Sequence, residues 1–458
     1  MSAAWAAALL VSACAVLEPH YERPGLPVPN QWPDSAATLP AGSTALPEWR
    51  AFFTDQKLQT LIGMALEENR DLRVAALNIE RARSQYRIQR AQSLPAIDAV
   101  ATGQIDSLTI AGDEAIERQY SAGAGVTAFE LDLFGRVRGL NRAALQTYLA
   151  TADARDSVQI SLIAEAATAY LTYAGDLELL RLAQDTLTAQ QQSLDLTRQR
   201  FEAGASSQLD LNRAQTIVET ARADVARYTA QTARDENALA LLIGAPVPTD
   251  LRPTTIDAVA FGAAELPAGL PSEVLLNRPD IRESEHLLRA ANADIGAARA
   301  AFFPSVTISA FGGETDPRFE NLFQGSANEI WSFTPQINIP IFRGGALLAG
   351  LGVANADRDI AVAQYERAIQ AAFREVADAL ATRAAIDDEL AARQALTEAA
   401  GGSYTLSEAR YREGIDNYLS LLDAQRELYA AQQGLVSARV AQATSLVTLY
   451  KALGGGER

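Results

Sequence analysis

The chain has 458 residues, of which 48% are hydrophobic and 7% aromatic, so it is long enough for a sizeable core and for two or three ordinary domains. Its 39 basic and 56 acidic residues give a net charge of −17, which argues against nucleic acid as a partner because phosphate binding needs a basic face. One cysteine, Cys14, and two histidines, His20 and His286, provide neither a disulfide framework nor a histidine-rich metal site.

Residues 1–13 are predicted to be a signal peptide and not part of the fold. The apolar run from Ala3 to Ala13 is shorter than the ~20 residues that a membrane-spanning helix needs. The small residues before Cys14 resemble a bacterial lipobox, which would make Cys14 the first mature residue and the carrier of a lipid, whereas otherwise it would be a buried or idle cysteine. No Lys or Arg precedes the apolar run, which a misassigned start at Met1 would explain.

Residues 14–50 are predicted to form a lipid-anchored, extended arm. The prolines of this segment are Pro19, Pro24, Pro27, Pro29, Pro33, Pro40 and Pro47. Proline fixes φ and lacks an N–H donor, so such a segment forms neither a long helix nor a central strand. We expect the arm to lie along a surface of the folded protein.

The rest of the chain is a tandem duplication. Asp71-Leu72-Arg73 matches Asp280-Ile281-Arg282 at an offset of 209 (280 − 71), and the segment 200–204 matches 410–414 at an offset of 210 (410 − 200). An internal repeat determines how a chain divides into structural units, so the duplication is considered before the individual helices and strands. It predicts a first repeat over 51–250, a linker over 251–270 and a second repeat over 271–458.

Each repeat is predicted to begin with a helix followed by two strands. The helices cover 72–93 and 281–303, up to Pro95 and Pro304. Apolar and polar residues then alternate over 97–106, 120–134, 305–310 and 331–342, with a change of phase near Phe129. Since no apolar run beyond the N-terminus could form a spanning helix, a membrane crossing would use these strands, and four strands would need other copies to pair their edges. An ordinary soluble pair of hairpins is the alternative.

Two long helices complete each repeat. The segments 136–203 and 345–413 contain no proline and would each reach roughly 100 Å if continuous, so they are expected to pack side by side. Gly204 and Gly414 suit the left-handed conformation that ends a helix, and Ser207 or Asp416 could cap the helix that follows. We therefore expect two related hairpin tips at one end of the molecule.

Several motifs together resemble one family. They are Cys14 with Pro19, Tyr21 and Pro24; Phe134-Gly135-Arg136; Phe302-Phe303-Pro304; the run from Tyr411 to Leu419 continuing through Leu422-Asp423-Ala424-Gln425; and Leu449 to Gly454. Across essentially the whole mature chain, these motifs resemble the TolC-type outer-membrane factors, most closely the OprM-like (NodT-type) lipoproteins of RND efflux pumps. The resemblance implies a mainly α fold with a small β part: helical hairpins forming a trimeric periplasmic barrel, and four strands per chain completing a trimeric, twelve-stranded outer-membrane β-barrel.

The resemblance also implies roles for particular residues. In the family an aspartate ring and an apolar ring line the periplasmic entrance, and Asp423 and Leu419 match these positions, while Tyr411 matches a tyrosine that ties the tip closed. Three converging carboxylates would repel one another and favour cations, and three leucines could form a dewetting constriction. The alternatives are a solvated charge, ordinary hairpin packing and a packed aromatic. In the first half, Asn212 after Leu209 lacks the acid.

The implied function is the outer-membrane exit duct of a tripartite efflux system that exports small molecules such as drugs. The duct would be lipid-anchored, extend into the periplasm, and work with a periplasmic adaptor (a membrane fusion protein) and an inner-membrane RND transporter. The residues expected to contact the adaptor are Gly204, Ala205, Ser206, Gly414, Ile415 and Asp416. The sequence contains no catalytic constellation, so no enzyme activity, metal or cofactor is expected apart from the lipid on Cys14. The alternatives are a duct for metal ions or secreted proteins, and a non-conducting coiled-coil scaffold.

Overall fold

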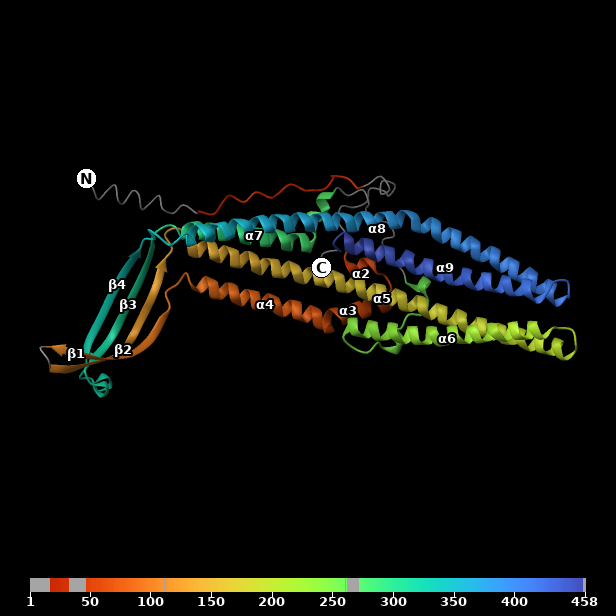
Figure 1. The fold of residues 1–458 in the computed structure, drawn as a ribbon, viewed down its shortest axis with the longest axis horizontal. Helices are drawn as coiled ribbons and strands as arrows, with labels where there is room; N and C mark the ends of the chain where they lie inside the picture. The colour runs from red at the N-terminus through yellow and green to blue at the C-terminus, as the bar shows by residue number, and fades with distance from the viewer. Residues whose placement is uncertain (1–16, 33–46, 111–112, 260, 262–271, 456–458) are drawn as a thin grey trace. The chain divides into compact units, whose positions relative to one another are not determined.

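The structure is a computed structural model that describes residues 17–32, 47–110, 113–259, 261 and 272–455. The signal peptide 1–13 and Cys14 therefore lie outside the described residues. Long helices and one four-stranded sheet dominate the described part of the chain (Figure 1). The chain divides into two compact units, one of Met1–Gly25, Leu77–Asp153 and Arg282–Arg367, the other of Leu26–Ala76, Ala154–Ile281 and Ala368–Arg458.

The same order of elements occurs twice, which confirms the predicted plan of one helix, two strands and two long helices. The first copy consists of α4 (Arg70–Ala91), β1 (Ile97–Ile110), β2 (Asp113–Leu131), α5 (Arg136–Glu202) and α6 (Gln208–Ile243). The second consists of α7 (Pro279–Ala300), β3 (Ser305–Asp316), β4 (Asn328–Asn338), α8 (Ala346–Arg412) and α9 (Tyr418–Ala452). Both α5 and α8 are continuous over 67 residues. The repeat boundaries 51–250 and 271–458 stay a prediction.

Several short elements were not predicted. They are α2 (Trp49–Phe52), α3 (Gln56–Glu68) and the 3-10 helices η3 (Thr249–Leu251), η4 (Ile256–Ala258), η5 (Ser272–Asn277) and η6 (Phe319–Phe323). Asp55 caps α3 by accepting a hydrogen bond from Leu58 N, at 2.6 Å. Leu58, Leu61 and Ile62 of α3 are completely buried, so this helix belongs to the core of the second unit.

In the first unit, the strands form one antiparallel sheet in the order β1-β2-β3-β4. The pairing of β2 with β3 shifts between Val126 and Phe129, which confirms the change of phase predicted near Phe129. Apolar side chains on one face of the sheet are exposed, including Ile97 at 75% and Trp331 at 81%. None of the helices in the described part of the chain is both long enough and apolar enough to cross a membrane.

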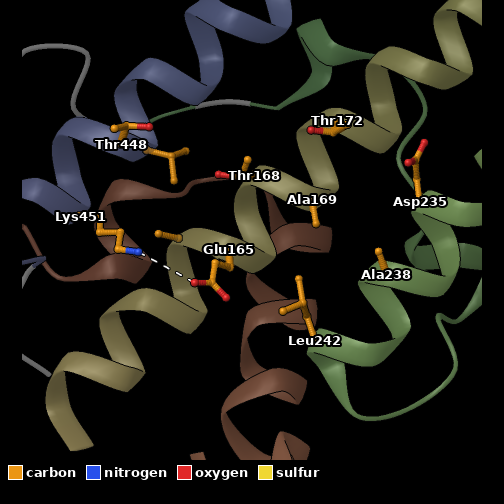
Figure 2. A pocket seen from close by; sticks show the side chains of 11 residues that line it. Glu165, Thr168, Ala169, Thr172, Asp235, Ala238, Leu242, Thr448 and Lys451 are labelled. Atoms are coloured by element: carbon orange, nitrogen blue, oxygen red, sulfur yellow. Dashed lines mark ion pairs between the residues drawn. The ribbon is translucent and has the colours of Figure 1, made fainter. Parts of the chain in front are cut away.

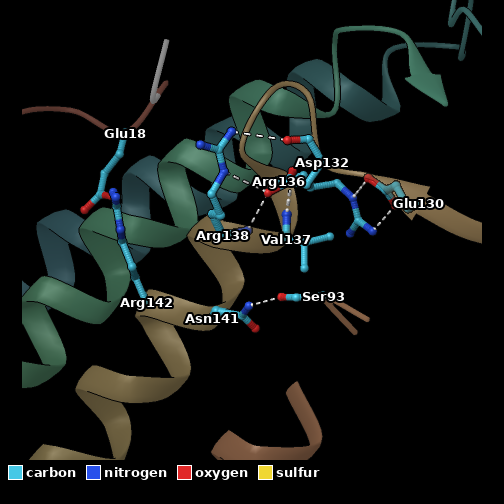
Figure 3. A network of polar contacts seen from close by, with 9 residues as sticks. All are labelled: Glu18, Ser93, Glu130, Asp132, Arg136, Val137, Arg138, Asn141 and Arg142. Carbon is cyan, nitrogen blue, oxygen red and sulfur yellow. Dashed lines mark hydrogen bonds and ion pairs between the residues drawn. The ribbon is translucent and has the colours of Figure 1, made fainter. Parts of the chain in front are cut away.

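The described start of the arm, from Leu17 onward, has no regular secondary structure and lies along α7. Arg299 donates a hydrogen bond to the carbonyl of Leu17 at 3.2 Å, and Asn292 donates to that of Pro19 at 2.9 Å. Glu18 pairs with Arg142 of α5 at 2.5 Å (Figure 3). The arm therefore follows a helix surface, as its prolines predict.

A buried carboxylate on α7 fixes the next part of the arm. Glu285, whose side chain is 8% exposed, accepts hydrogen bonds from Tyr21 at 3.0 Å and from Arg23 at 3.0 and 2.9 Å. Burial alone would raise the pKa of the Glu285 carboxyl, but these hydrogen bonds and the charge of Arg289 lower it below its usual value. Glu285 is therefore ionised at neutral pH and holds the arm by charge-assisted bonds.

In the second unit, aromatic residues near the end of α9 pack against α2. The rings of Phe52 and Tyr450 stack with centroids 4.3 Å apart, and Phe53 and Phe261 lie against the same cluster. Phe52 and Phe53 are completely buried. This packing fixes the C-terminal end of α9 within the second unit.

Candidate functional site at the hairpin tips

The two hairpin tips, all of whose residues belong to the second unit, have the same helix ending. Gly204 and Gly414 each have a φ of 75°, which glycine adopts without the steric cost of a side chain. Ala205 N donates to Arg200 O at 2.7 Å, and Ile415 N donates to Arg410 O at 2.9 Å. Each ending is thus a Schellman motif that satisfies carbonyls left free at the helix end, as predicted from the two glycines.

The caps of the following helices differ between the tips. Ser207 caps α6 in a capping box with Asp210, which confirms the prediction for the first tip. The prediction that Asp416 caps α9 is wrong, because Asn417 directly precedes the helix and accepts a hydrogen bond from Ser420 N at 3.1 Å. Asp416 instead accepts two hydrogen bonds from Arg410, at 2.6 and 2.9 Å. These bonds lower the pKa of the Asp416 carboxyl.

Behind the turns, the tips share one hydrophobic cluster. Its buried members are Leu194, Ala214, Val218, Tyr411, Tyr418, Leu421 and Leu422. Tyr411 is 7% exposed, and its ring lies 5.6 Å from that of Tyr418. The cluster combines side chains of α5, α6, α8 and α9, so the two hairpins are packed against each other next to their tips.

Arg200, which sequence reasoning did not single out, connects the first tip to the second. Its guanidinium lies 4.7 Å from the centroid of the Tyr411 ring and donates to the carbonyls of Tyr411, at 3.4 Å, and Arg412, at 3.1 Å. Arg410, its equivalent in the second repeat, binds Asp416 within its own turn. The repeat alignment could have drawn attention to Arg200, but it gives no indication that the two arginines bind different partners.

Of the three residues predicted to form the gate, two are exposed and one is buried. Leu419 is 42% exposed and Asp423 is also exposed; one helical turn apart on α9, they share a face. Tyr411 is buried in the cluster behind them. Leu419 and Asp423 are thus available to a partner or a central axis, and the gate roles of all three residues remain predictions.

The caps correct the comparison of Asp423 with Asn212. Asp423 is six residues after the cap Asn417, and the residue six positions after the cap Ser207 is Arg213. Arg213 lies 3.7 Å from Asp210. The equivalent positions of the two tips therefore carry opposite charges.

The residues predicted to contact an adaptor all lie at the turns. Gly204, Ala205, Gly414 and Ile415 are exposed, Ile415 at 63%, whereas Ser206 and Asp416 are half-buried. An exposed isoleucine on a turn can be buried by a binding partner. The contact itself stays a prediction.

A second polar site lies in the first unit, where the sheet meets the helices, at the Phe134-Gly135-Arg136 motif (Figure 3). Asp132 accepts hydrogen bonds from Val137 N at 3.1 Å and Arg138 N at 2.9 Å, and so satisfies first-turn amides of α5. Arg136 binds Glu130 of β2 at 2.9 and 2.5 Å. These bonds fix the direction in which α5 leaves the strand.

Across the described residues, no group of three or more His, Cys, Asp or Glu side chains is arranged to hold a metal ion. The polar contacts at the tips and at the junction instead order backbone turns and helix ends. These contacts therefore have a structural role, which is to fix the conformation of the turns and the helix ends.

Comparisons with known proteins show which family the chain resembles. The family model described as outer membrane efflux protein matches residues 61–245 and 270–455. The chain is 48% identical over 458 residues to the probable efflux pump outer membrane protein TtgC of Pseudomonas putida, covering 98% of this chain and 94% of that protein. It is 42% identical over 453 residues to the outer membrane protein OprJ of Pseudomonas aeruginosa, covering 98% and 94%. The open state of the Neisseria gonorrhoeae MtrE outer membrane channel matches with a TM-score of 0.87 and 38% identity, covering 96% of this chain and 98% of that one.

Proposed function

The chain belongs to the outer membrane efflux protein family, and from this membership we propose that it is the outer-membrane exit duct of a tripartite efflux system that exports small molecules such as drugs. The observation that carries the proposal is the similarity to an efflux pump protein over 98% of the chain. Other relatives are named as components of pumps for toluene, solvents and antibiotics. The outer membrane of a Gram-negative bacterium is the corresponding location.

We propose that three copies of the chain assemble into the duct. β1 and β4 are the edge strands of the sheet, and each edge has backbone groups that can pair with another copy. The exposed apolar side chains of the sheet, such as Trp331, would then face lipid. Assembly therefore satisfies the edges and the apolar face together.

The periplasmic end is proposed to be closed by the second tip. Three copies of Leu419 would form an apolar constriction, and three copies of Asp423 would form a cation-selective ring next to it. Tyr411 would act from behind, because its buried ring and the Arg200 contacts hold the tips together. Opening would require separation of contacts that the tips make in this structure.

The duct is proposed to act with a periplasmic adaptor and an inner-membrane RND transporter. The adaptor would contact the turns, at Gly204, Ala205, Ser206, Gly414, Ile415 and Asp416. A lipid on Cys14 would anchor the arm, whose contacts with α7 run from Leu17 onward. The anchor and the tips would then fix the position of the duct in the envelope.

The test is single-channel conductance of the purified protein in a planar bilayer. We expect the parent protein to be mostly closed and the double variant Leu419→Ala, Asp423→Ala to conduct clearly more. The matched control is Leu209→Ala, Arg213→Ala, which makes the equivalent changes in the first tip and should leave conductance low. Inserted protein that stays silent in the parent and both variants would contradict the gate and support a non-conducting scaffold.

A further inference from the structure

A cavity lies on the side of α5 that faces away from its packed core. Ile163, Ala166, Ala167, Tyr170 and Leu171 are buried and share one face of the helix. At 100° per residue, the stripe of Glu165, Thr168, Ala169 and Thr172 falls on the opposite face. This stripe lines a cavity of about 540 Å³ within the second unit (Figure 2).

The walls of this cavity, called here the α5 groove, come from α6 and α9. The remaining lining residues are Ala164 of α5, Asp235, Ala238 and Leu242 of α6, and Val447, Thr448 and Lys451 of α9. Alanine, leucine and valine side chains supply an apolar body, and three threonines add hydroxyl groups. The size and composition fit a small organic molecule rather than a single ion, because such sites are typically about 300 to 1,000 Å³ and mostly apolar.

The two ends of the groove differ in charge. At one end Glu165 and Lys451 are 3.9 Å apart and neutralise each other (Figure 2). At the other end Asp235 accepts a hydrogen bond at Oδ1 from Gln231, at 2.9 Å, while its Oδ2 is buried and receives none. Because no cation among the described residues balances the charge at Oδ2 of Asp235, this end of the groove attracts positively charged groups.

A second carboxyl strengthens the acidic end. Asp176 follows Thr172 by one helical turn, and burial together with the neighbouring Asp235 raises the pKa of Asp176 to about 6. Gln231 and Arg227 of α6 act in the opposite direction, but Arg227 also binds Asp224, at 2.8 Å. When Asp176 is ionised, it and Asp235 place two carboxylates close to each other, and a bound cation would relieve their repulsion.

We propose that the α5 groove binds an amphipathic organic cation, with its apolar part against Ala169, Ala238 and Leu242 and its positive charge at Asp235. An anion would be repelled at this end, and a neutral molecule without a hydrogen-bond donor would leave Oδ2 of Asp235 without a partner. The inference rests on the proposed function, because a duct would bring such solutes to the groove, and it specifies a chemical class of solute that the duct wall would hold.

The test introduces single cysteines as reporters, which is practical because the sequence contains one native cysteine, Cys14. Thr172→Cys places a new thiol in the groove, and Thr188→Cys places one at an exposed site elsewhere on α5. The rate of modification by the uncharged N-ethylmaleimide is measured in the purified trimer, with the parent protein as background. We expect benzyltrimethylammonium to slow modification at residue 172 at least about fivefold and not to change it at residue 188.

Charge selectivity is tested with ligands and with variants. Neopentylbenzene, the uncharged isostere of the probe, should protect about tenfold less well, as should the cation in Asp235→Asn. Asp235→Glu should retain protection, and the control Asp185→Asn, an exposed acid on α5, should leave it unchanged. Because the cation favours ionised Asp176, its affinity should rise about tenfold from pH 5 to pH 7.

Three outcomes would overturn the proposal: no protection at residue 172, equal protection by the uncharged isostere, or a thiol at residue 172 that stays unreactive because a second copy covers the groove. Conductance of the same parent preparation separates this failure from failure of the proposed function. A parent protein that supports the gated conductance but shows no cation protection would refute the groove alone.

Discussion

Asn69 and Arg278 occupy equivalent positions just before the first helix of each repeat, and each binds the end of that repeat's last helix. Asn69 donates to the carbonyl of Leu242 at the end of α6, at 2.9 Å, and Arg278 donates to that of Ala452 at the end of α9. Carbonyls at a helix C-terminus need partners, so both repeats must meet the same backbone requirement. The comparison teaches that the requirement has been retained while the side chain that meets it has changed.

The contacts of residues 17–25 of the arm show the opposite case, in which the two repeats carry different side chains at the positions that the arm meets on α7. At an offset of 209, Glu285 of α7 corresponds to Ala76 of α4, and Gly296 corresponds to Arg87. A Cβ at position 296 would lie 2.9 Å from Cα of Glu18, so a glycine is needed where the arm crosses α7. The described start of the arm, residues 17–25, therefore binds the second copy of this helix.

The largest effect is expected at the helix-end contacts. Arg278 is 8% exposed and also binds Asp280 and Glu375, at 2.7 and 2.9 Å. Arg278→Ala removes three partners at once and should lower the free energy of unfolding by about 3 kcal/mol. The side-chain oxygen of Asn69 also accepts a hydrogen bond from Leu72 N at 2.9 Å, so Asn69→Ala removes a helix cap and one carbonyl contact and should cost about 1 kcal/mol. Thermal unfolding followed by circular dichroism would measure both, and equal losses would contradict the comparison.

The sequence predicted those features that depend on the backbone alone. Two glycines 210 residues apart (414 − 204) predicted two equal helix ends, and alternation predicted the strands and the irregularity near Phe129. The partners of long side chains could not be predicted in this way. Arg200 and Arg410 are equivalent in sequence, yet one crosses to the other tip and one stays in its own turn, since the choice depends on packing that no local pattern encodes.

A second prediction exchanges the arm surface. Gly296→Arg gives α7 the residue that α4 has at the equivalent position, and the larger side chain should displace the arm at Glu18. We expect the free energy of unfolding to fall by about 2 kcal/mol and proteolysis between residues 17 and 25 to become faster. Arg87→Ala in α4 is the matched control and should leave the arm protected. An arm that remains protected in Gly296→Arg would show that Glu285 alone is sufficient to hold it.

A third prediction separates the two equivalent arginines. Arg200→Ala removes the hydrogen bonds and the ring contact that join the tips, and should weaken their association by about 1 kcal/mol. This corresponds to about a fivefold increase in the open probability in a planar bilayer. Arg410→Ala should change the open probability less, because its bonds to Asp416 stay within one tip. Equal increases would place both arginines in the contact between tips.

The smallest effect is expected at Asp416. Its pKa is lowered by Arg410, so any stability from this pair is present above the ordinary carboxyl pKa of about 3.9 and is lost only as the pH falls through the lower folded-state value. The contribution of this pair to stability should therefore be constant between pH 5 and pH 8. The pair is exposed to solvent and screened, so Asp416→Asn should leave the unfolding midpoint unchanged at neutral pH. Ser207→Ala in the first tip should lower the free energy of unfolding by about 1 kcal/mol, because it removes a helix cap. A larger loss of stability from Asp416→Asn than from Ser207→Ala would contradict this prediction.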